Sequence, residues 1–194
     1  KTMNIKQTMD SLIDGMKLML LACVILTLAW SLGAITGDMA LADFIVAKLG
    51  GSMSFGLLPI VIFLLGMAIS FATGTSWGTM TILTPIAIPL AYRITGDVTT
   101  SVMMAGVVFS GAIFGDHCSP ISDTTVLASI FSGADHIDHV STQIPYALTT
   151  AGVALLMYIF YGLFNLSPAI LIPVGLVILY LLLNVLGGKS VNKA

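Results

Sequence analysis

Charged side chains are scarce in this sequence of 194 residues. Lysine and arginine together number seven and aspartate and glutamate nine, so that 8% of the residues are charged while 57% are hydrophobic. An ordinary soluble domain carries about 25% charged residues, which cover its surface against water. The composition therefore excludes a water-soluble domain and predicts that lipid covers most of the surface. The net charge of −2 gives no indication of a nucleic-acid partner.

Cysteine is almost as scarce, with two residues in the chain. Cys23 lies in an apolar run and Cys118 in a polar segment, so neither fits an extracellular disulfide framework, and we expect no disulfide. The opening residues, 1–17, lack the apolar core and small-residue cleavage site of a signal peptide, and we expect a further part of the protein upstream. Transporters often form their substrate site between two repeats. The expected partners are membrane lipid and an N-terminal half or second repeat, with a homodimer also open.

Long uncharged apolar runs are the main feature that is present. About 20 such residues in a helix cross the hydrocarbon core of a bilayer. The sequence predicts an all-α membrane protein with a single transport domain over residues 1–194. We expect four to five transmembrane helices, a re-entrant helical hairpin and a discontinuous helix, which together form one repeat of an inverted-repeat transporter. The expected elements are a span at 18–35, an interfacial helix at 36–54, a hairpin at 55–92, a discontinuous helix at 98–131, and spans at 144–166 and 169–186.

The hairpin is expected because two apolar arms meet at the polar segment 72–78, and the second arm contains Pro85 and Pro89, which predict a kinked or short helix. The hydroxyls in this tip could form one wall of an ion site; they belong to Thr73, Thr75 and Ser76. An interfacial loop, with Trp77 in the aromatic belt, is the alternative interpretation. If the hairpin makes no crossing, both termini lie on one side, and the flanking lysines favour the cytoplasm.

The discontinuous helix is expected because the segment Gly115–Thr125 interrupts an apolar run. Ser119 and Pro120 fit an N-cap and a first helical residue, so we expect a half-helix to begin at Pro120. Hard oxygen ligands for a sodium ion would then come from Asp116, Asp123, Ser119 and Thr124. The alternative is that Asp123 only caps a helix and Asp116 lies at the aqueous boundary. Aspartates at membrane depth are costly and tend to mark ion or proton paths, which favours the ion site.

His117 could relay protons or could make only a structural hydrogen bond. Its neighbour Cys118 suggests a nucleophile pair, but adjacent side chains point apart, and we do not favour catalysis. The residues 135–139 contain two aspartates and two histidines at a spacing that could bind a metal ion. Without a cysteine or a second cluster nearby, we interpret them as part of a hydrated polar loop over Ser132–Thr142.

Taken together, the segments 72–78 and 115–125 closely resemble those of the NhaC-type sodium/proton antiporters, which are similar in organisation to the wider ion-transporter superfamily. The flanking spans follow the same plan over most of Asp14–Leu166. The resemblance implies exchange of sodium for protons across a bacterial inner membrane, with related members exchanging sodium lactate or malate with protons. Family members are about twice as long, so the resemblance also implies that the chain is the C-terminal half.

Our leading hypothesis is a secondary transporter in which Asp116 and Asp123 bind either sodium or protons, which are cargo rather than cofactors, so that no cofactor is expected. A second hypothesis is a sodium- or proton-coupled exchanger of a small carboxylate. Neither break contains an arginine to hold such an anion. A third is an intramembrane hydrolase with an aspartate dyad, which we do not favour because the two acids lie on either side of a proline. We therefore expect a transporter and not an enzyme.

Overall fold

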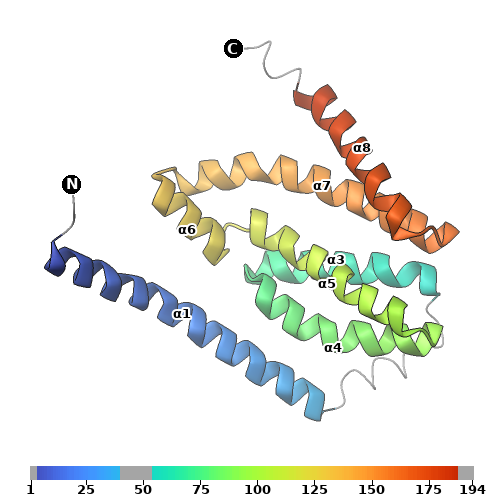
Figure 1. Cartoon of the computed structure of the whole chain (residues 1–194), viewed down its shortest axis with the longest axis horizontal. Helices are drawn as coiled ribbons and strands as arrows, with labels where there is room; N and C mark the ends of the chain where they lie inside the picture. Colours follow the sequence, from blue (N-terminus) through green and yellow to red (C-terminus); the bar gives the residue numbers. More distant parts are fainter. Residues whose placement is uncertain (1–3, 40–53, 188–194) are drawn as a thin grey trace.

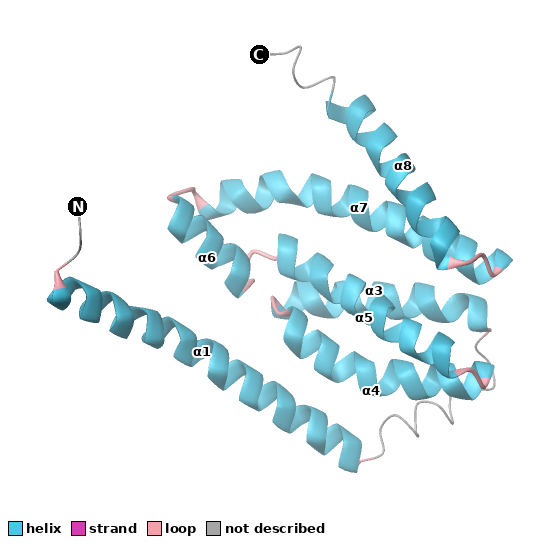
Figure 2. Cartoon of the chain, in the orientation of Figure 1, coloured by secondary structure: helices cyan, strands magenta, loops and turns pink. Residues whose placement is uncertain are grey.

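The chain is helical throughout the part that the structure describes. The computed structural model describes residues 4–39 and 54–187, where helices alternate with short turns (Figure 2). The helices are α1 (Ile5–Asp38), a 3₁₀ turn (Phe55–Leu57), α3 (Leu58–Thr73), α4 (Ser76–Thr95), α5 (Val98–Cys118), α6 (Asp123–Ser132), α7 (His136–Phe164) and α8 (Pro168–Gly187). Within the described residues, four segments are long and apolar enough to cross a membrane: Phe55–Thr73, Val98–Cys118, His136–Phe164 and Pro168–Val185. The expected all-α membrane protein is confirmed.

The helices α3, α4 and α5 pack against one another and form the central bundle (Figure 1). Their shared core consists of fully buried apolar side chains, among them Leu58, Phe63, Leu90, Met104 and Val108. Helix α7 packs on α5 and α3, α8 packs on α7, and α1 lies against α4. The central bundle therefore fixes where the ends of α3, α4 and α5 lie.

Small residues allow α3 and α5 to approach closely. A Cβ added to Gly111 would lie 2.6 Å from Phe63 O, and one added to Gly66 would lie 3.2 Å from the Cα of Gly111. Because lipid provides no hydrophobic drive between helices, such backbone contact is a main source of their association. Gly66 and Gly111 therefore allow α3 and α5 to pack backbone against backbone.

Some expected boundaries differ from those observed. Helix α7 begins at His136, so the expected loop Ser132–Thr142 is wrong in extent; Asp135 caps this helix by accepting hydrogen bonds from Ile137 N and Asp138 N at 2.9 and 3.0 Å. Helix α4 continues through both prolines to Thr95 and is not shortened, because α3 and α5 pack along it.

Other expectations cannot be compared with the structure. The interfacial helix expected at 36–54 falls mostly outside the described residues, as do Lys1, Lys189 and Lys193. The predicted orientation in the membrane stays a prediction. The arms of the hairpin, α3 and α4, contain 16 and 20 residues, and α3 with its preceding turn is long enough to cross a membrane. The prediction that the hairpin makes no crossing likewise stays a prediction.

Candidate functional site at two helix breaks

The tip of the hairpin and the break after α5 lie at the same end of the central bundle (Figure 1). Ser119 follows α5 and its Oγ donates a hydrogen bond to Phe71 O in the last turn of α3 at 2.8 Å. Gly74 in the tip has φ of 68°, and a Cβ there would lie 2.6 Å from Ile121 O. Glycine is therefore needed at this position both for its left-handed backbone and for the close approach. The two breaks that the sequence indicates are in direct contact.

The linker Ser119–Ser122 is a turn, and this corrects one prediction. Ser122 N donates to Ser119 O at 3.1 Å, which places Pro120 at the second position of the turn, where its fixed φ is favourable. Helix α6 then begins at Asp123, three residues after the expected start at Pro120. Ser122 caps α6, because its Oγ accepts from Thr125 N at 3.4 Å and its carbonyl accepts from Val126 N at 2.9 Å. Ser119 is instead the C-cap of α5.

Asp116, in the last turn of α5, is the residue on which hydroxyl groups from both breaks converge. Its Oδ1 accepts hydrogen bonds from Ser122 Oγ at 2.9 Å and from Thr124 Oγ1 at 3.0 Å. Its Oδ2 accepts from Ser76 Oγ, at the start of α4, at 3.1 Å. Thr125 Oγ1 also donates to the backbone carbonyl of Asp116 at 2.9 Å. We call Asp116 with the hydroxyls of Ser76, Ser122 and Thr124 the hydroxyl shell.

Ends of four helices meet at the hydroxyl shell. Helices α3 and α5 end there, while α4 and α6 begin there. The last carbonyls of a helix carry a partial negative charge and the first amides a partial positive charge. Carbonyl and amide ends thus lie side by side, an arrangement through which broken helices bind ions in transporters.

The position of α7 indicates how deep the hydroxyl shell lies. This helix contacts α6 on one side of the break and α5 on the other (Figure 1). The ten residues of α6 are about 15 Å long at 1.5 Å per residue. The break therefore lies beside the first part of the 29-residue α7, near Gln143 and Tyr146, which line one cavity together with His117. A carboxylate at that depth is expensive unless a cation or hydrogen bonds compensate its charge.

The predicted site residues divide into those that the structure brings together and those that it does not. Asp116, Ser76, Thr124 and Ser119 lie at the contact between the breaks. Thr75 is half-buried and caps α4, because its Oγ1 accepts a hydrogen bond from Gly78 N at 3.4 Å. The side chain of Asp123 lies outside the described residues, so a two-carboxylate site stays a prediction.

Two other predicted residues point elsewhere. Thr73 is exposed and its Oγ1 donates to Ile69 O at 2.8 Å within its own helix. His117 is exposed and its Nδ1 lies 3.0 Å from Ile113 O. Its side chain also lines a cavity of about 470 Å³ between α5 and α7, which includes Tyr146. His117 is therefore separate from the hydroxyl shell, although it follows Asp116 directly in the sequence.

Sequence reasoning missed Ser122, Thr125 and Ser70. All three are buried, and Ser70 Oγ donates to Ala112 O between α3 and α5. The pattern Ser122-Asp123-Thr124-Thr125 before an apolar run is a helix-start signal, and it could have identified Ser122 as the cap. The sequence holds no comparable signal for Ser70, whose partner lies 42 positions away.

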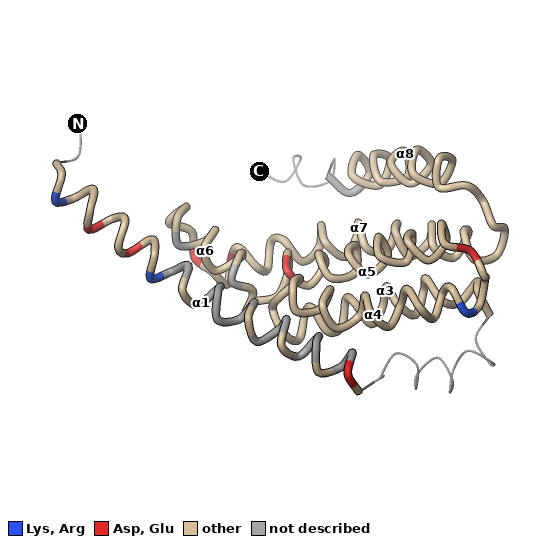
Figure 3. Tube along the Cα trace, turned by 60° about the horizontal axis from the view of Figure 1, so that its bottom comes forward, with Lys and Arg blue, Asp and Glu red and all other residues tan. Residues whose placement is uncertain are grey.

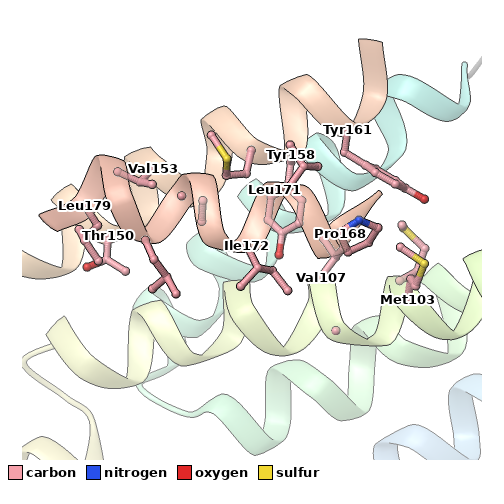
Figure 4. Close-up of a pocket in the computed structure, with 16 residues that line it drawn as sticks. Met103, Val107, Thr150, Val153, Tyr158, Tyr161, Pro168, Leu171, Ile172 and Leu179 are labelled. Atoms are coloured by element: carbon pink, nitrogen blue, oxygen red, sulfur yellow. The ribbon is translucent and has the colours of Figure 1, made fainter. Parts of the chain in front are cut away.

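A second cavity, of about 540 Å³, lies between α5, α7 and α8 and is away from the hydroxyl shell (Figure 4). Its lining is apolar apart from the hydroxyls of Thr150, Tyr158 and Tyr161, and it offers no carboxylate to a cation. Among the described residues, no group of three or more histidine, cysteine or acidic side chains is placed to hold a metal ion. The metal site considered at 135–139 is therefore not formed by that part of the chain.

Charged residues are sparse along the helices that surround the hydroxyl shell (Figure 3). Between residues 54 and 187 the sequence has one lysine or arginine, Arg93, in the last turn of α4 and hence at the end of that helix opposite the tip. In the described part of the chain the one ion pair joins Lys17 to Asp14 on α1. Asp116 is thus held by hydroxyl groups and not by a lysine or arginine.

Comparison with known proteins places these features in a family. Residues 1–163 match the model of the Na+/H+ antiporter family, a range that ends in α7 and leaves α8 outside. No solved structure matches the chain significantly.

Three relatives can be compared in detail. An uncharacterized protein of Haemophilus influenzae is 40% identical over 162 residues, which cover 84% of this chain and 31% of that protein. An uncharacterized Na(+)/H(+) antiporter of the same organism is 34% identical over 95 residues, 49% of this chain and 20% of the relative. The malate-2H(+)/Na(+)-lactate antiporter of Bacillus subtilis is 35% identical over 101 residues, 48% of this chain and 19% of the relative.

The matched segments span less than a third of the length of these relatives. The resemblance to sodium/proton antiporters seen in the sequence is confirmed at the level of the family, while the narrower NhaC type stays a prediction. With most of its length matched by the family model, this chain belongs to the Na+/H+ antiporter family.

Proposed function

We propose that the full-length protein exchanges sodium ions for protons across a bacterial inner membrane, and that the two cations compete for Asp116. The main support is the hydroxyl shell, in which three hydroxyl groups from two helix breaks donate to one carboxylate. Carboxylate and hydroxyl oxygens are hard ligands, which suit a sodium ion. Family membership and a relative named as an Na(+)/H(+) antiporter agree with this function.

A shell of hydroxyl groups suits a carboxylate that changes its charge. A serine or threonine hydroxyl has one donor and two acceptor positions, and its hydrogen rotates to suit its partner. The hydroxyls of Ser76 and Ser122 can donate to ionised Asp116, accept from the protonated acid, or turn their lone pairs toward a sodium ion. A lysine in this place would donate only and would favour the ionised state alone.

Competition at Asp116 would couple the two fluxes. An ionised carboxylate binds sodium, and a protonated one does not, so each sodium ion that binds releases a proton. Movement of the hairpin tip against the linker would expose the site to one side at a time, since Ser76 belongs to the tip and Ser122 to the linker. The gradient of one cation can then drive the other without any covalent step.

The test is sodium-driven proton movement in inverted membrane vesicles that contain the full-length protein. Asp116→Asn should abolish it, because asparagine keeps the size and hydrogen bonding of aspartate but does not titrate. Asp97→Asn is the matched control at the other end of α5, where Asp97 is an exposed helix cap, and it should keep the wild-type rate. Equal rates for Asp116→Asn and the wild type at matched expression would contradict the proposal.

A second candidate is exchange coupled to a small carboxylate. The name of the Bacillus subtilis relative favours it, and the N-terminal ends of α4 and α6 at the hydroxyl shell could bind an anion. Against it, Arg93 is the one lysine or arginine in residues 54–187 and lies at the other end of α4. Sodium-driven proton movement that requires added malate or lactate would favour this candidate over simple cation exchange.

A further inference from the structure

A second polar cluster joins α6 to the first turn of α7. Ser129 is 1% exposed, and its Oγ lies 3.1 Å from His136 Nδ1 and 2.8 Å from His139 Nδ1. The same oxygen lies 2.9 Å from Thr125 O, one turn earlier in α6. His136 Nε2 lies 2.7 Å from Pro120 O in the linker between α5 and α6. His136 therefore touches both the linker and the buried serine.

The hydrogen atoms available decide the charge of His136. The carbonyls of Pro120 and Thr125 can only accept hydrogen bonds. The bond to Pro120 O therefore needs a hydrogen on His136 Nε2, and the bond to Thr125 O needs the hydroxyl hydrogen of Ser129. With its single hydrogen used in this way, Ser129 can only accept from the Nδ1 atoms of His136 and His139. All four contacts are hydrogen bonds only when both nitrogens of His136 carry hydrogen, which is the protonated imidazolium.

A neutral His136 makes one bond fewer. Its remaining hydrogen stays on Nε2, because the Pro120 carbonyl cannot donate, and its Nδ1 must accept from the hydroxyl of Ser129. The hydroxyl then turns away from Thr125 O. His139 must donate from Nδ1 in both cases, because Ser129 has no second hydrogen to offer.

From this count we propose that His136 is a second proton-binding site, at which uptake of a proton at Nδ1 turns the hydroxyl of Ser129 to Thr125 O and strengthens the bond between α7 and the linker. Hydrogen bonds from a charged donor are stronger than those from a neutral one, so the imidazolium holds Pro120 O more tightly. The linker ends at Ser122, whose hydroxyl donates to Asp116. The second site therefore acts on a segment that also contributes to the hydroxyl shell.

The charged groups around His136 are few. Its own helix carries Asp138 and His139 beside it, and Asp135 caps the helix with Oδ1 bonded to backbone amides. In the linker and on α6 the sequence has one ionisable group, Asp123, whose side chain lies outside the described residues. Within the described part of the chain no ion pair fixes the charge of His136.

The experiment is solid-state ¹⁵N NMR of the full-length protein labelled at histidine, in lipid vesicles between pH 5 and pH 9. His136→Gln and His139→Gln assign the signals. At low pH both ring nitrogens of His136 should be protonated, and raising the pH should remove the hydrogen from Nδ1 and leave Nε2–H. Neutral His139 should show the opposite tautomer, Nδ1–H. Loss of the Nε2 hydrogen from His136, or a ring of His136 that is never protonated in this range, would overturn the proposal.

Matched variants separate the hydroxyl of Ser129 from its surroundings. Ser129→Ala should weaken proton binding at His136 by about threefold to tenfold, because the hydroxyl of Ser129 bonds the charged imidazolium more strongly than the neutral ring and only this difference is lost. Ser132→Ala should leave it unchanged, because Ser132 is an exposed serine of the same helix that bonds only Ala128 O and Ser129 O. Equal titration of His136 in both variants would refute the assigned bond.

Hydrogen exchange tests the connection to the linker. His136→Gln should speed amide exchange at 119–122 by about threefold to tenfold, while His139→Gln should not. Unchanged exchange in His136→Gln would overturn the connection. None of these measurements depends on transport. Asp116→Asn should leave the NMR result for His136 unaltered while it abolishes sodium/proton exchange. Failure of the proposed function and failure of the His136 site are thus seen in separate experiments.

Discussion

Replacing Gly115 by alanine tests whether α3 and α5 are in backbone contact beside the hydroxyl shell. An added Cβ would overlap Phe71 N and the carbonyl carbon of Ser70, and would lie 2.5 Å from Ser70 Oγ. Ordinary contacts of a Cβ begin near 3.4 Å. These atoms belong to the hydrogen-bonded last turn of α3 and cannot move aside alone, so the two helix ends must separate or slide.

Gly115→Ala should lower the free energy of unfolding for two reasons. Overpacking of this kind destabilises a folded protein by about 1–3 kcal/mol. Separation also weakens two hydrogen bonds between the helices, Ser70 Oγ to Ala112 O and Ser119 Oγ to Phe71 O, each worth about 1 kcal/mol. The higher helix propensity of alanine stabilises the helix by about 1 kcal/mol, so the free energy of unfolding should fall by about 2–4 kcal/mol in total. Because Asp116 follows Gly115 directly, its bond to Ser76 on the hairpin should also be lost.

Gly106→Ala is the matched control on the same helix. No atom lies within 4 Å of a Cβ built on Gly106, so alanine there should be neutral or slightly stabilising. The assay is thermal unfolding of the purified full-length protein in detergent, followed by sodium-driven proton movement in vesicles. Gly115→Ala should unfold at a clearly lower temperature than Gly106→Ala and lose exchange. If the two variants unfold at the same temperature, the close approach of α3 and α5 at this position is wrong.

Two further predictions concern the ends of α5. Pro120→Ala should reduce sodium/proton exchange in vesicles more than Pro89→Ala. Pro120 fixes φ in the turn beside the hydroxyl shell, whereas Pro89 lies inside the continuous α4. Equal activity of the two variants at matched expression would contradict this prediction. Hydrogen bonds from Thr100, first from its hydroxyl and second from its amide, lower the pKa of Asp97. Ionised Asp97 therefore stabilises the folded protein at pH values above its ordinary pKa of 3.8, and this stabilisation is lost as the pH falls below that value. Asp97→Asn, which still caps the helix, should lose less stability than the wild type when unfolding is compared at pH 5 and pH 3, and an equal loss would show that Asp97 does not contribute.

The sequence predicts the helices and the positions of the breaks well, because both depend on local composition. Uncharged runs of spanning length identify α3, α5, α7 and α8, and the polar segments 72–78 and 115–125 identify the two interruptions. The start of α6 was harder to predict, because both Ser119-Pro120 and Ser122-Asp123 are acceptable helix starts. The bond from Ser119 to Phe71 O decides between them by holding Ser119 against α3, and that contact joins residues 48 positions apart.

The partners of a site residue are less predictable than the residue itself. Asp116 was expected in the site because an aspartate inside an apolar run is costly unless it is compensated. Which hydroxyls surround it depends on how α4 and α6 pack, and Thr73 was expected there although its hydroxyl turns back to Ile69 O. His136 was expected in a hydrated loop, since nothing local shows that Asp135 starts a helix whose first turn meets Ser129.

Charge balance gives a reason for exchange that does not depend on the detailed geometry. Between residues 54 and 187 the sequence contains a single lysine or arginine, Arg93, and it lies at the end of α4 opposite the tip, so no fixed cation compensates Asp116. Hydroxyl groups lower the cost of the ionised carboxylate but leave its charge in place. Inside a membrane, such a charge is best neutralised by a cation that enters from solution, and a proton or a sodium ion can each do so. Because one carboxylate accepts one unit of positive charge, binding of either cation would displace the other, which is the competition that we propose at Asp116.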